Sequence, residues 1–178
     1  MTPTSELSRL SEPITSSDHI RGAADAPVRI VEYGEFECVY CGRAYHAIQR
    51  VLEQAPGEVA FVFRHFARDE VHPFSERSAQ AAEAAGSQGR FWEMHDFLFE
   101  RQHQLEYDDL VRHAGELGLD VGRFEQEMVD RVHLGTIRRH RDSGVASGVD
   151  ETPALFINGD RYMGPYDTGS LLAAVRAR

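Results

Sequence analysis

The chain has 178 residues, of which 42% are hydrophobic, enough to form the core of one domain with room for an insertion. Its formal net charge of −10 at pH 7 argues against nonspecific nucleic-acid binding. Residues 1–17 lack the apolar run of a secretory signal, and no segment is long enough to span a membrane. We therefore expect a flexible arm at 1–17 and a cytoplasmic protein with no membrane partner. A chain whose signal had been removed would look the same, and it would be extracytoplasmic.

The first part of the chain predicts a short edge strand, a central strand and a helix. Residues 18–27 are typical of a short strand and a turn, and the apolar, β-branched run at 28–33 is typical of a buried strand. Cys38-Val39-Tyr40-Cys41 follows, and apolar residues then recur at helical spacing as far as position 52. A strand therefore leads into a CxxC motif that begins a helix.

This position of the CxxC motif predicts a redox-active dithiol. Two cysteines at i and i+3 in the first helical turn lie on one face, close enough to form a disulfide. Cys38 lies where helix N–H groups have no intrahelical partner, and these groups stabilise a thiolate, the nucleophile of disulfide exchange. We expect Cys38 to attack or be attacked and the better covered Cys41 to resolve the mixed disulfide.

A CxxC motif can also be half of a zinc site. The chain has two cysteines in all, its nine histidines are scattered along the sequence, and no second CxxC or HxxxH completes a tetrahedral set. We therefore predict no metal, and no cofactor other than the redox-active pair Cys38–Cys41. A metal-binding protein remains as an alternative class.

Glu32 lies six residues before Cys38 on the predicted buried strand. Burying an unpaired carboxylate costs free energy, which suggests a functional role for Glu32. Beneath a dithiol it can take and return a proton through water with a raised pKa, which would give it a catalytic role. The alternative is that Glu32 points to a solvated strand edge.

The rest of the chain predicts one more strand, a run of helices and a closing hairpin. Residues 59–63 are expected to form a strand parallel to the central one through a right-handed crossover. Helices are then expected at 75–87, 91–101, 107–117, 121–129 and 132–147. Thr152-Pro153 precedes a strand at 154–157, a turn, a strand at 161–163 and a last helix at 167–177.

Together these segments resemble the DsbA-like branch of the thioredoxin superfamily, soluble oxidoreductases that carry a helical domain inserted in the thioredoxin fold. The resemblance rests on residues 18–22 and 26–28, Glu32, Cys38-Val39-Tyr40-Cys41, 148–153 and 156–159. It implies an α/β protein, with a central mixed sheet flanked by helices over 18–68 and 149–178 and an inserted α-helical bundle over 69–148.

The same resemblance assigns roles to individual residues. It implies that Pro153 is a cis-proline facing the disulfide and that Thr152 offers its backbone to an extended substrate. Glu32 matches the buried acid of the family. Tyr40, which lies between the two cysteines, is expected to contact substrate together with Thr152 and Pro153.

The charges near the cysteines predict a dithiol less oxidising than that of DsbA. The pair Val39-Tyr40 lacks the histidine that strongly oxidising family members carry there, and acids surround the motif at Glu35, Glu37, Asp150 and Glu151. Like charges raise the pKa of a thiolate, and a less stable thiolate lowers the reduction potential. The alternative is that these acids are solvated and screened and shift the pKa little.

We therefore predict a protein-disulfide oxidoreductase, with the reductase or isomerase direction left open. Its expected partners are protein or small-molecule thiols and disulfides and an electron donor or acceptor, and it is expected to be a monomer or a homodimer. The alternative is a redox-sensing or partner-binding domain of the thioredoxin fold that performs no turnover.

Overall fold

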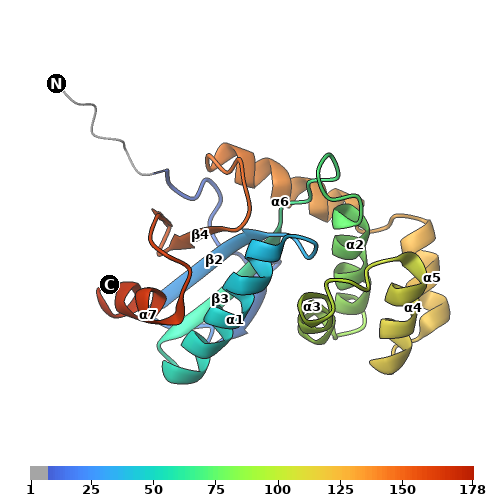
Figure 1. The fold of residues 1–178 in the computed structure, drawn as a ribbon, viewed down its shortest axis with the longest axis horizontal. Coiled ribbons are helices and arrows are strands. Elements are labelled where there is room, and N and C mark those ends of the chain that lie inside the picture. Colours follow the sequence, from blue (N-terminus) through green and yellow to red (C-terminus); the bar gives the residue numbers. More distant parts are fainter. Residues whose placement is uncertain (1–7) are drawn as a thin grey trace.

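The computed structural model describes residues 8–178, which fold around a mixed five-stranded sheet (Figure 1). The sheet has the order β1-β3-β2-β4-β5, with β2 parallel to β3 and the other neighbouring pairs antiparallel. The strands are β1 (His19–Gly22), β2 (Val28–Gly34), β3 (Val59–His65), β4 (Ala154–Ile157) and β5 (Asp160–Tyr162). The α/β class and the mixed central sheet predicted from the sequence are confirmed.

The two faces of the sheet are covered by different helices. Side chains alternate between the faces along a strand, so Ile30 and Glu32 share one face of β2 while Val31 and Tyr33 share the other. Ile30 packs in the core cluster that includes α1 (Val39–Gln54) and α7 (Thr168–Arg176). Tyr33 lies under α6 (Leu134–Ala146), where its hydroxyl hydrogen-bonds Ser143 at 2.8 Å. The face that bears Glu32 is therefore the face that the CxxC helix covers.

The segment between β3 and β4 is helical, as the sequence predicts. The four helices α2 (Ser75–Gly86), α3 (Phe91–Glu100), α4 (Tyr107–Glu116) and α5 (Val121–Val129) lie beside the sheet, and α6 leads the chain back across it (Figure 1). Buried alanines on α2 allow its neighbours to approach closely. Whether this segment is a separate domain with boundaries at 69 and 148 stays a prediction. Within residues 8–178, no helix combines the length and the apolar run that a membrane crossing requires.

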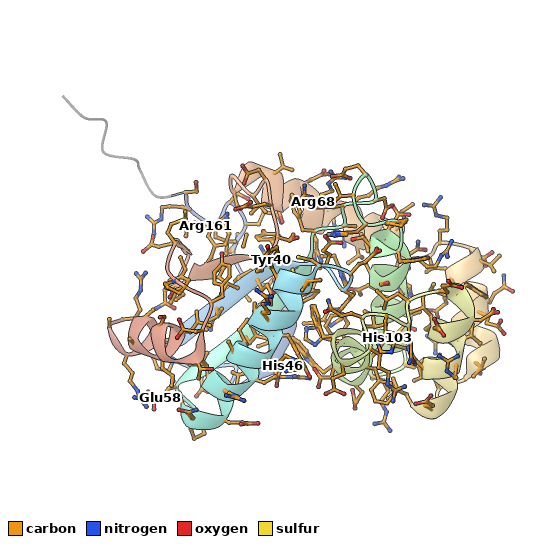
Figure 2. All side chains as sticks on the ribbon, in the orientation of Figure 1. Tyr40, His46, Glu58, Arg68, His103 and Arg161 are labelled. Carbon is orange, nitrogen blue, oxygen red and sulfur yellow. The ribbon has the colours of Figure 1, made fainter. Side chains whose placement is uncertain are left out.

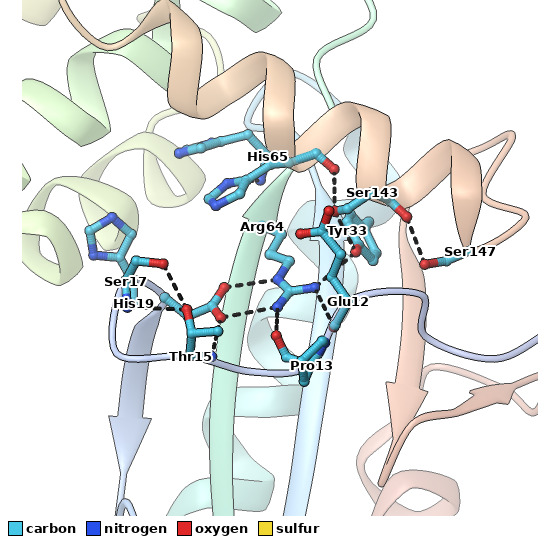
Figure 3. A network of polar contacts seen from close by, with 12 residues as sticks. Glu12, Pro13, Thr15, Ser17, His19, Tyr33, Arg64, His65, Ser143 and Ser147 are labelled. Atoms are coloured by element: carbon cyan, nitrogen blue, oxygen red, sulfur yellow. Dashed lines mark hydrogen bonds and ion pairs between the residues drawn. The ribbon is translucent and has the colours of Figure 1, made fainter.

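The arm expected to be flexible is held against the fold over its described part, residues 8–17. The backbone N–H of Leu10 donates to a carbonyl of the β4–β5 turn at 2.9 Å. The buried guanidinium of Arg64 donates to two backbone carbonyls of the arm (Figure 3). Leu10 and Ile14 of the arm also pack against a buried cluster on this face of the sheet. Two isolated apolar residues in a polar segment give no periodic pattern, so the sequence did not predict this contact. The first seven residues of the predicted arm lie outside the described part of the chain.

Candidate active site

Cys38 is the N-cap residue of α1, which places the CxxC motif at the start of a helix as expected. Its Sγ accepts a hydrogen bond from the backbone N–H of Cys41 at 3.4 Å. Both cysteines are free thiols; Cys38 is 4% exposed and Cys41 is fully buried. Cys38 also lines an open cleft, so it is the sulfur that a partner can reach.

The two cysteines differ widely in acidity. Hydrogen bonds from the Cys41 thiol and from the backbone N–H groups of Cys41 and Tyr40 outweigh the effect of burial and lower the pKa of Cys38 to about 5. Burial, together with the neighbouring Cys38 and the charge of Glu32, raises the pKa of Cys41 well above its usual value. At neutral pH Cys38 is therefore a thiolate and Cys41 a protonated thiol.

The prediction that surrounding acids raise the pKa of Cys38 is wrong, because hydrogen-bond donors at the sulfur have the larger effect. The acids are also engaged elsewhere or exposed. Glu35 is buried and hydrogen-bonds the imidazole of His72. Glu37 accepts a hydrogen bond of 2.8 Å from the backbone N–H of Phe74 at the start of α2, and Glu151 is exposed.

Glu32 is buried at the centre of the sheet, 1% exposed, with its Oε1 lacking a hydrogen-bond partner among the described residues. The alternative of a solvated strand edge is therefore wrong, because β2 lies between β3 and β4. Burial, with a further contribution from the charge of Cys38, raises the pKa of Glu32 to about 8. Glu32 is therefore neutral while Cys38 is charged. When the charge of Cys38 disappears, the pKa of Glu32 falls and its carboxyl group can exchange a proton.

The segment that contains Thr152 and Pro153 packs directly against the cysteines. The peptide bond between these two residues is cis. The backbone carbonyl of Thr152 lies 3.5 Å from Sγ of Cys38 and accepts its hydrogen bond when Cys38 is protonated. The Thr152 hydroxyl donates to Glu35 at 3.4 Å. The carbonyl of Pro153 accepts a hydrogen bond from the hydroxyl of Tyr166 at 3.1 Å.

An open cleft of about 350 Å³ is lined by Cys38, and a second of about 360 Å³, which shares some of its lining residues, is lined by Pro153. Tyr40, Thr152 and Glu151 border both clefts, and Tyr40 projects at the N-terminal end of α1 near Arg68 (Figure 2). Val39 is 61% exposed, Tyr40 65% and Val71 53%. An apolar surface therefore adjoins the thiolate. The structure thus brings Tyr40, Thr152 and Pro153 together around the cysteines, while their roles toward a substrate stay predictions.

Sequence reasoning missed two residues that contact this site. Gln102, in the loop between α3 and α4, donates hydrogen bonds of 2.8 Å to the backbone carbonyls of Phe36 and Cys38. His72, which precedes α2, binds the buried carboxylate of Glu35. Neither belongs to a motif, and both lie far from the CxxC in sequence, so no local signal could have identified them.

A family model described as Thioredoxin matches residues 15–177, and the chain belongs to this family. It is 46% identical over 158 residues to the Na(+)/H(+) antiporter NhaA 3 of Salinispora tropica, covering 89% of this chain and 24% of the antiporter. It is 42% identical over 175 residues to NhaA 1 of Mycolicibacterium gilvum, covering 95% and 28% of the two chains. The chain thus spans about a quarter of the length of the curated relatives it matches.

Solved structures show the same architecture. A thioredoxin-like oxidoreductase from Silicibacter pomeroyi is similar with a TM-score of 0.82 and 23% identity, covering 92% of each chain. Alpha-DsbA1 from Wolbachia pipientis is similar with a TM-score of 0.79 and 18% identity, again covering 92% of each chain. The fold is therefore DsbA-like, as the sequence resemblance predicted.

The cytoplasmic location expected from the sequence is wrong. The structural neighbours include proteins of the DsbA type, and this likeness overturns the expectation. The prediction had rested on the composition of the first residues. That composition does not determine the location, because the chain spans only about a quarter of the length of its relatives.

Proposed function

We propose that this member of the thioredoxin family is a thiol–disulfide oxidoreductase that exchanges disulfides through Cys38 and Cys41. The observation that carries the proposal is the pairing of a thiolate, Cys38 with a pKa of about 5, with a buried thiol of raised pKa one helical turn away. Such a pair offers one nucleophile and one resolving group. The names of the structural neighbours, which include an oxidoreductase and a DsbA, support the same activity.

In the reductive direction, the Cys38 thiolate attacks one sulfur of a substrate disulfide. An intermolecular disulfide forms, and the other substrate sulfur leaves as a thiolate. Cys41 then loses its proton and attacks the Sγ of Cys38, which releases the second substrate sulfur. The substrate gains two electrons and the Cys38–Cys41 pair loses them. The oxidative direction is the reverse.

Glu32 is suited to accept the Cys41 proton at the right moment. While Cys38 is a thiolate, burial and that charge hold the pKa of Glu32 at about 8, so the acid is neutral. Once Cys38 is part of a mixed disulfide its charge is gone, and the pKa of Glu32 falls. The carboxylate then becomes the stronger base beside Cys41, whose pKa its charge already influences.

The cleft geometry supports an extended thiol or disulfide partner. Thr152 and Pro153 border the thiolate with backbone groups, and Tyr40 with Val39 provides an exposed apolar contact. A protein segment crossing the cleft would place a cysteine sulfur over Cys38. Small-molecule disulfides can reach the same sulfur. The cysteine pair itself is the redox group, and we propose no further cofactor for this exchange.

The acidity of Cys38 supports an intermediate redox strength. A pKa of about 5 lies between the values of about 3.5 for DsbA and about 7 for thioredoxin. Their potentials are about −120 and −270 mV, and a stabilised thiolate makes the disulfide more oxidising. We therefore propose a potential between these values, weaker as an oxidant than DsbA. This keeps the predicted direction but replaces its reason, since hydrogen bonds at the sulfur lower the pKa of Cys38 whatever the acids contribute.

A redox-sensing domain without turnover is the second candidate, favoured by the match to about a quarter of each of several antiporters. In that case the dithiol would report redox state to a partner segment. Multiple turnover on an unrelated disulfide separates the two functions. We expect reduction of insulin disulfides by the wild type and none by Cys38→Ser. A single stoichiometric exchange without turnover favours the sensor, and failure to form a reversible Cys38–Cys41 disulfide in redox buffers refutes both.

A further inference from the structure

Three histidines and a glutamate meet where the sheet contacts α2 and α6, although these histidines are scattered in the sequence. The group comprises His19 of β1, His65 of β3, Glu83 of α2 and His140 of α6. Figure 3 shows His19 and His65 on neighbouring strands on this side of the sheet. Ligand atoms of His65, Glu83 and His140 all lie within 4.8 Å of one another. None of the four residues lines the clefts beside Cys38.

Two of the distances in this group are close to those around a small cation, and His19 joins His65, Glu83 and His140 through its contact with Glu83. Oε1 of Glu83 lies 2.8 Å from Nε2 of His65 and 3.0 Å from Nε2 of His19. A tetrahedral zinc ion with bonds of about 2.0–2.1 Å holds its ligand atoms about 3.3 Å apart. Small side-chain shifts would therefore convert the hydrogen-bonded group into a set of three nitrogen donors and one oxygen donor.

The group is also unusually buried for polar side chains. His65 is 1% exposed and Glu83 7%. Nδ1 of His65 is buried without a hydrogen-bond partner in the described part of the chain. Arg64 and Asp18 form a buried ion pair at 2.8 Å, and both line the same cavity as His140 and Arg139. The carboxylate of Glu83 faces the imidazole rings of His65 and His19.

An ion has a route to this group. A cavity of about 190 Å³ is lined by His19, Glu83 and His140, and also by Asp18 and Thr136. The side chain of His19 is 23% exposed and stacks on Phe91, with its Nε2 directed at Glu83, so one ring edge lies toward the cavity and the other face packs on the core. An accessible path and correctly spaced donors are the two requirements of a metal site.

We propose that His19, His65, Glu83 and His140 bind one divalent transition-metal ion, for which Zn²⁺ is the natural probe because it favours imidazole and carboxylate ligands in tetrahedral geometry. Four protein ligands leave no open position, which is the form of a structural site. The ion would join β1 and β3 to α2 and α6. The proposed site is separate from the dithiol, so it does not depend on the proposed redox activity.

The test titrates Zn²⁺, and Co²⁺ as a spectroscopic substitute, into the oxidised protein, in which the Cys38–Cys41 disulfide cannot supply thiolate ligands. We expect one equivalent of Zn²⁺, an upward shift of the thermal midpoint, and the intense visible Co²⁺ bands of tetrahedral coordination. No thiolate-to-metal charge-transfer band should accompany them. Binding that occurs in the reduced protein alone would assign the metal to the cysteines and overturn the proposal.

Single substitutions then identify the ligands. His19→Gln and His140→Gln should each weaken Zn²⁺ binding at least tenfold and remove the thermal shift. His46→Gln, at an exposed histidine of α1 (Figure 2), is the matched control and should bind as the wild type does. Circular dichroism of each apo variant checks folding, and His19, the partly exposed member of the group, keeps the test valid if His140→Gln unfolds. The proposal is overturned if the wild type binds no stoichiometric Zn²⁺ or if all variants bind it equally. The four residues then form a hydrogen-bond network and not a metal site.

Discussion

The side-chain amide of Gln102 donates a hydrogen bond of 2.8 Å to the backbone carbonyl of Cys38. A second bond of the same length goes from this amide to Phe36. The loop between α3 and α4 is thereby attached to the residue that begins the CxxC helix. Packing is equally close on the other side, since a Cβ on Gly42 would come within 2.5 Å of the Gln102 side chain. The helical segment therefore helps to fix the position of the proposed nucleophile.

Replacing Gln102 by Leu should destabilise the protein and slow exchange at Cys38. Each lost hydrogen bond costs about 0.5–1.5 kcal/mol, so we expect the free energy of unfolding to fall by about 1–3 kcal/mol. Urea unfolding followed by circular dichroism measures this. Gln104→Leu is the control, because the Gln104 side chain bonds only the exposed His103 and Arg112 within the described chain. Equal effects in the two variants would show that Gln102 has no special structural role.

The acidity of Cys38 sets how its reactivity depends on pH. Because its pKa is lowered to about 5, the rate of alkylation by iodoacetamide should rise through pH 5 and level off by about pH 7. An ordinary cysteine would still be gaining reactivity at pH 8. Trapping followed by mass spectrometry of the Cys38 peptide measures the rate. A midpoint above pH 7 would contradict both the acidity and the intermediate redox strength.

The same pKa predicts a change in the slope of the reduction potential with pH. Below about pH 5 reduction takes up two protons with two electrons, so the potential falls by about 60 mV per pH unit. Above the pKa of Cys38 one proton is taken up, and the slope becomes about 30 mV per pH unit. Redox titrations read by thiol trapping at pH 4, 6 and 7 test this. An unbroken slope across pH 5 would refute it.

Glu32→Gln should slow closure of the disulfide without slowing the first attack. A neutral amide cannot take the proton of Cys41, and loss of a general base typically costs on the order of 10²-fold in rate. A rapid-mixing experiment that starts from the preformed mixed disulfide measures the rate at which the Cys38–Cys41 disulfide closes. The alkylation rate of Cys38 above pH 7 is the control and should be unchanged, since Cys38 is already a thiolate there. Unchanged closure would exclude Glu32 as the proton acceptor.

The same substitution should change how stability depends on pH in the oxidised protein. Burial raises the pKa of Glu32 above its unfolded value of about 4.5, so its contribution to stability is full below pH 4.5 and is lost as the pH rises through the folded pKa. We expect a loss on the order of a few kcal/mol in the wild type. Glu32→Gln should remove this loss. Urea unfolding at pH 5 and pH 8 would show it as a smaller difference between the two free energies of unfolding.

The exposed acids near the cysteines should matter little for the potential. Glu151→Gln should leave both the pKa of Cys38 and the midpoint potential unchanged within error, because Glu151 is exposed and screened by solvent. Thiol trapping in redox buffers measures the potential. A clear rise on substitution would restore the original electrostatic argument that these acids weaken the oxidant.

The succession of strands and helices was readable in the sequence because each depends on neighbours along the chain. The β-branched run before the CxxC and the helical spacing after it are local patterns. They were enough to predict Cys38 at a helix start, with donors for a thiolate, and the strand pair after Thr152-Pro153. The helix of residues 134–146 began two residues later than the pattern suggested, as helix ends often do.

The tertiary structure decided everything that depends on residues distant in sequence. Burial of Glu32 depends on β2 lying between two strands, one of which follows Thr152-Pro153 far along the chain. Gln102 reaches Cys38 only after the chain has folded, and the same is true of the group formed by His65, His140 and Glu83, with His19 in contact with Glu83. Local periodicity specifies secondary structure, but proximity between side chains is set by how those elements pack.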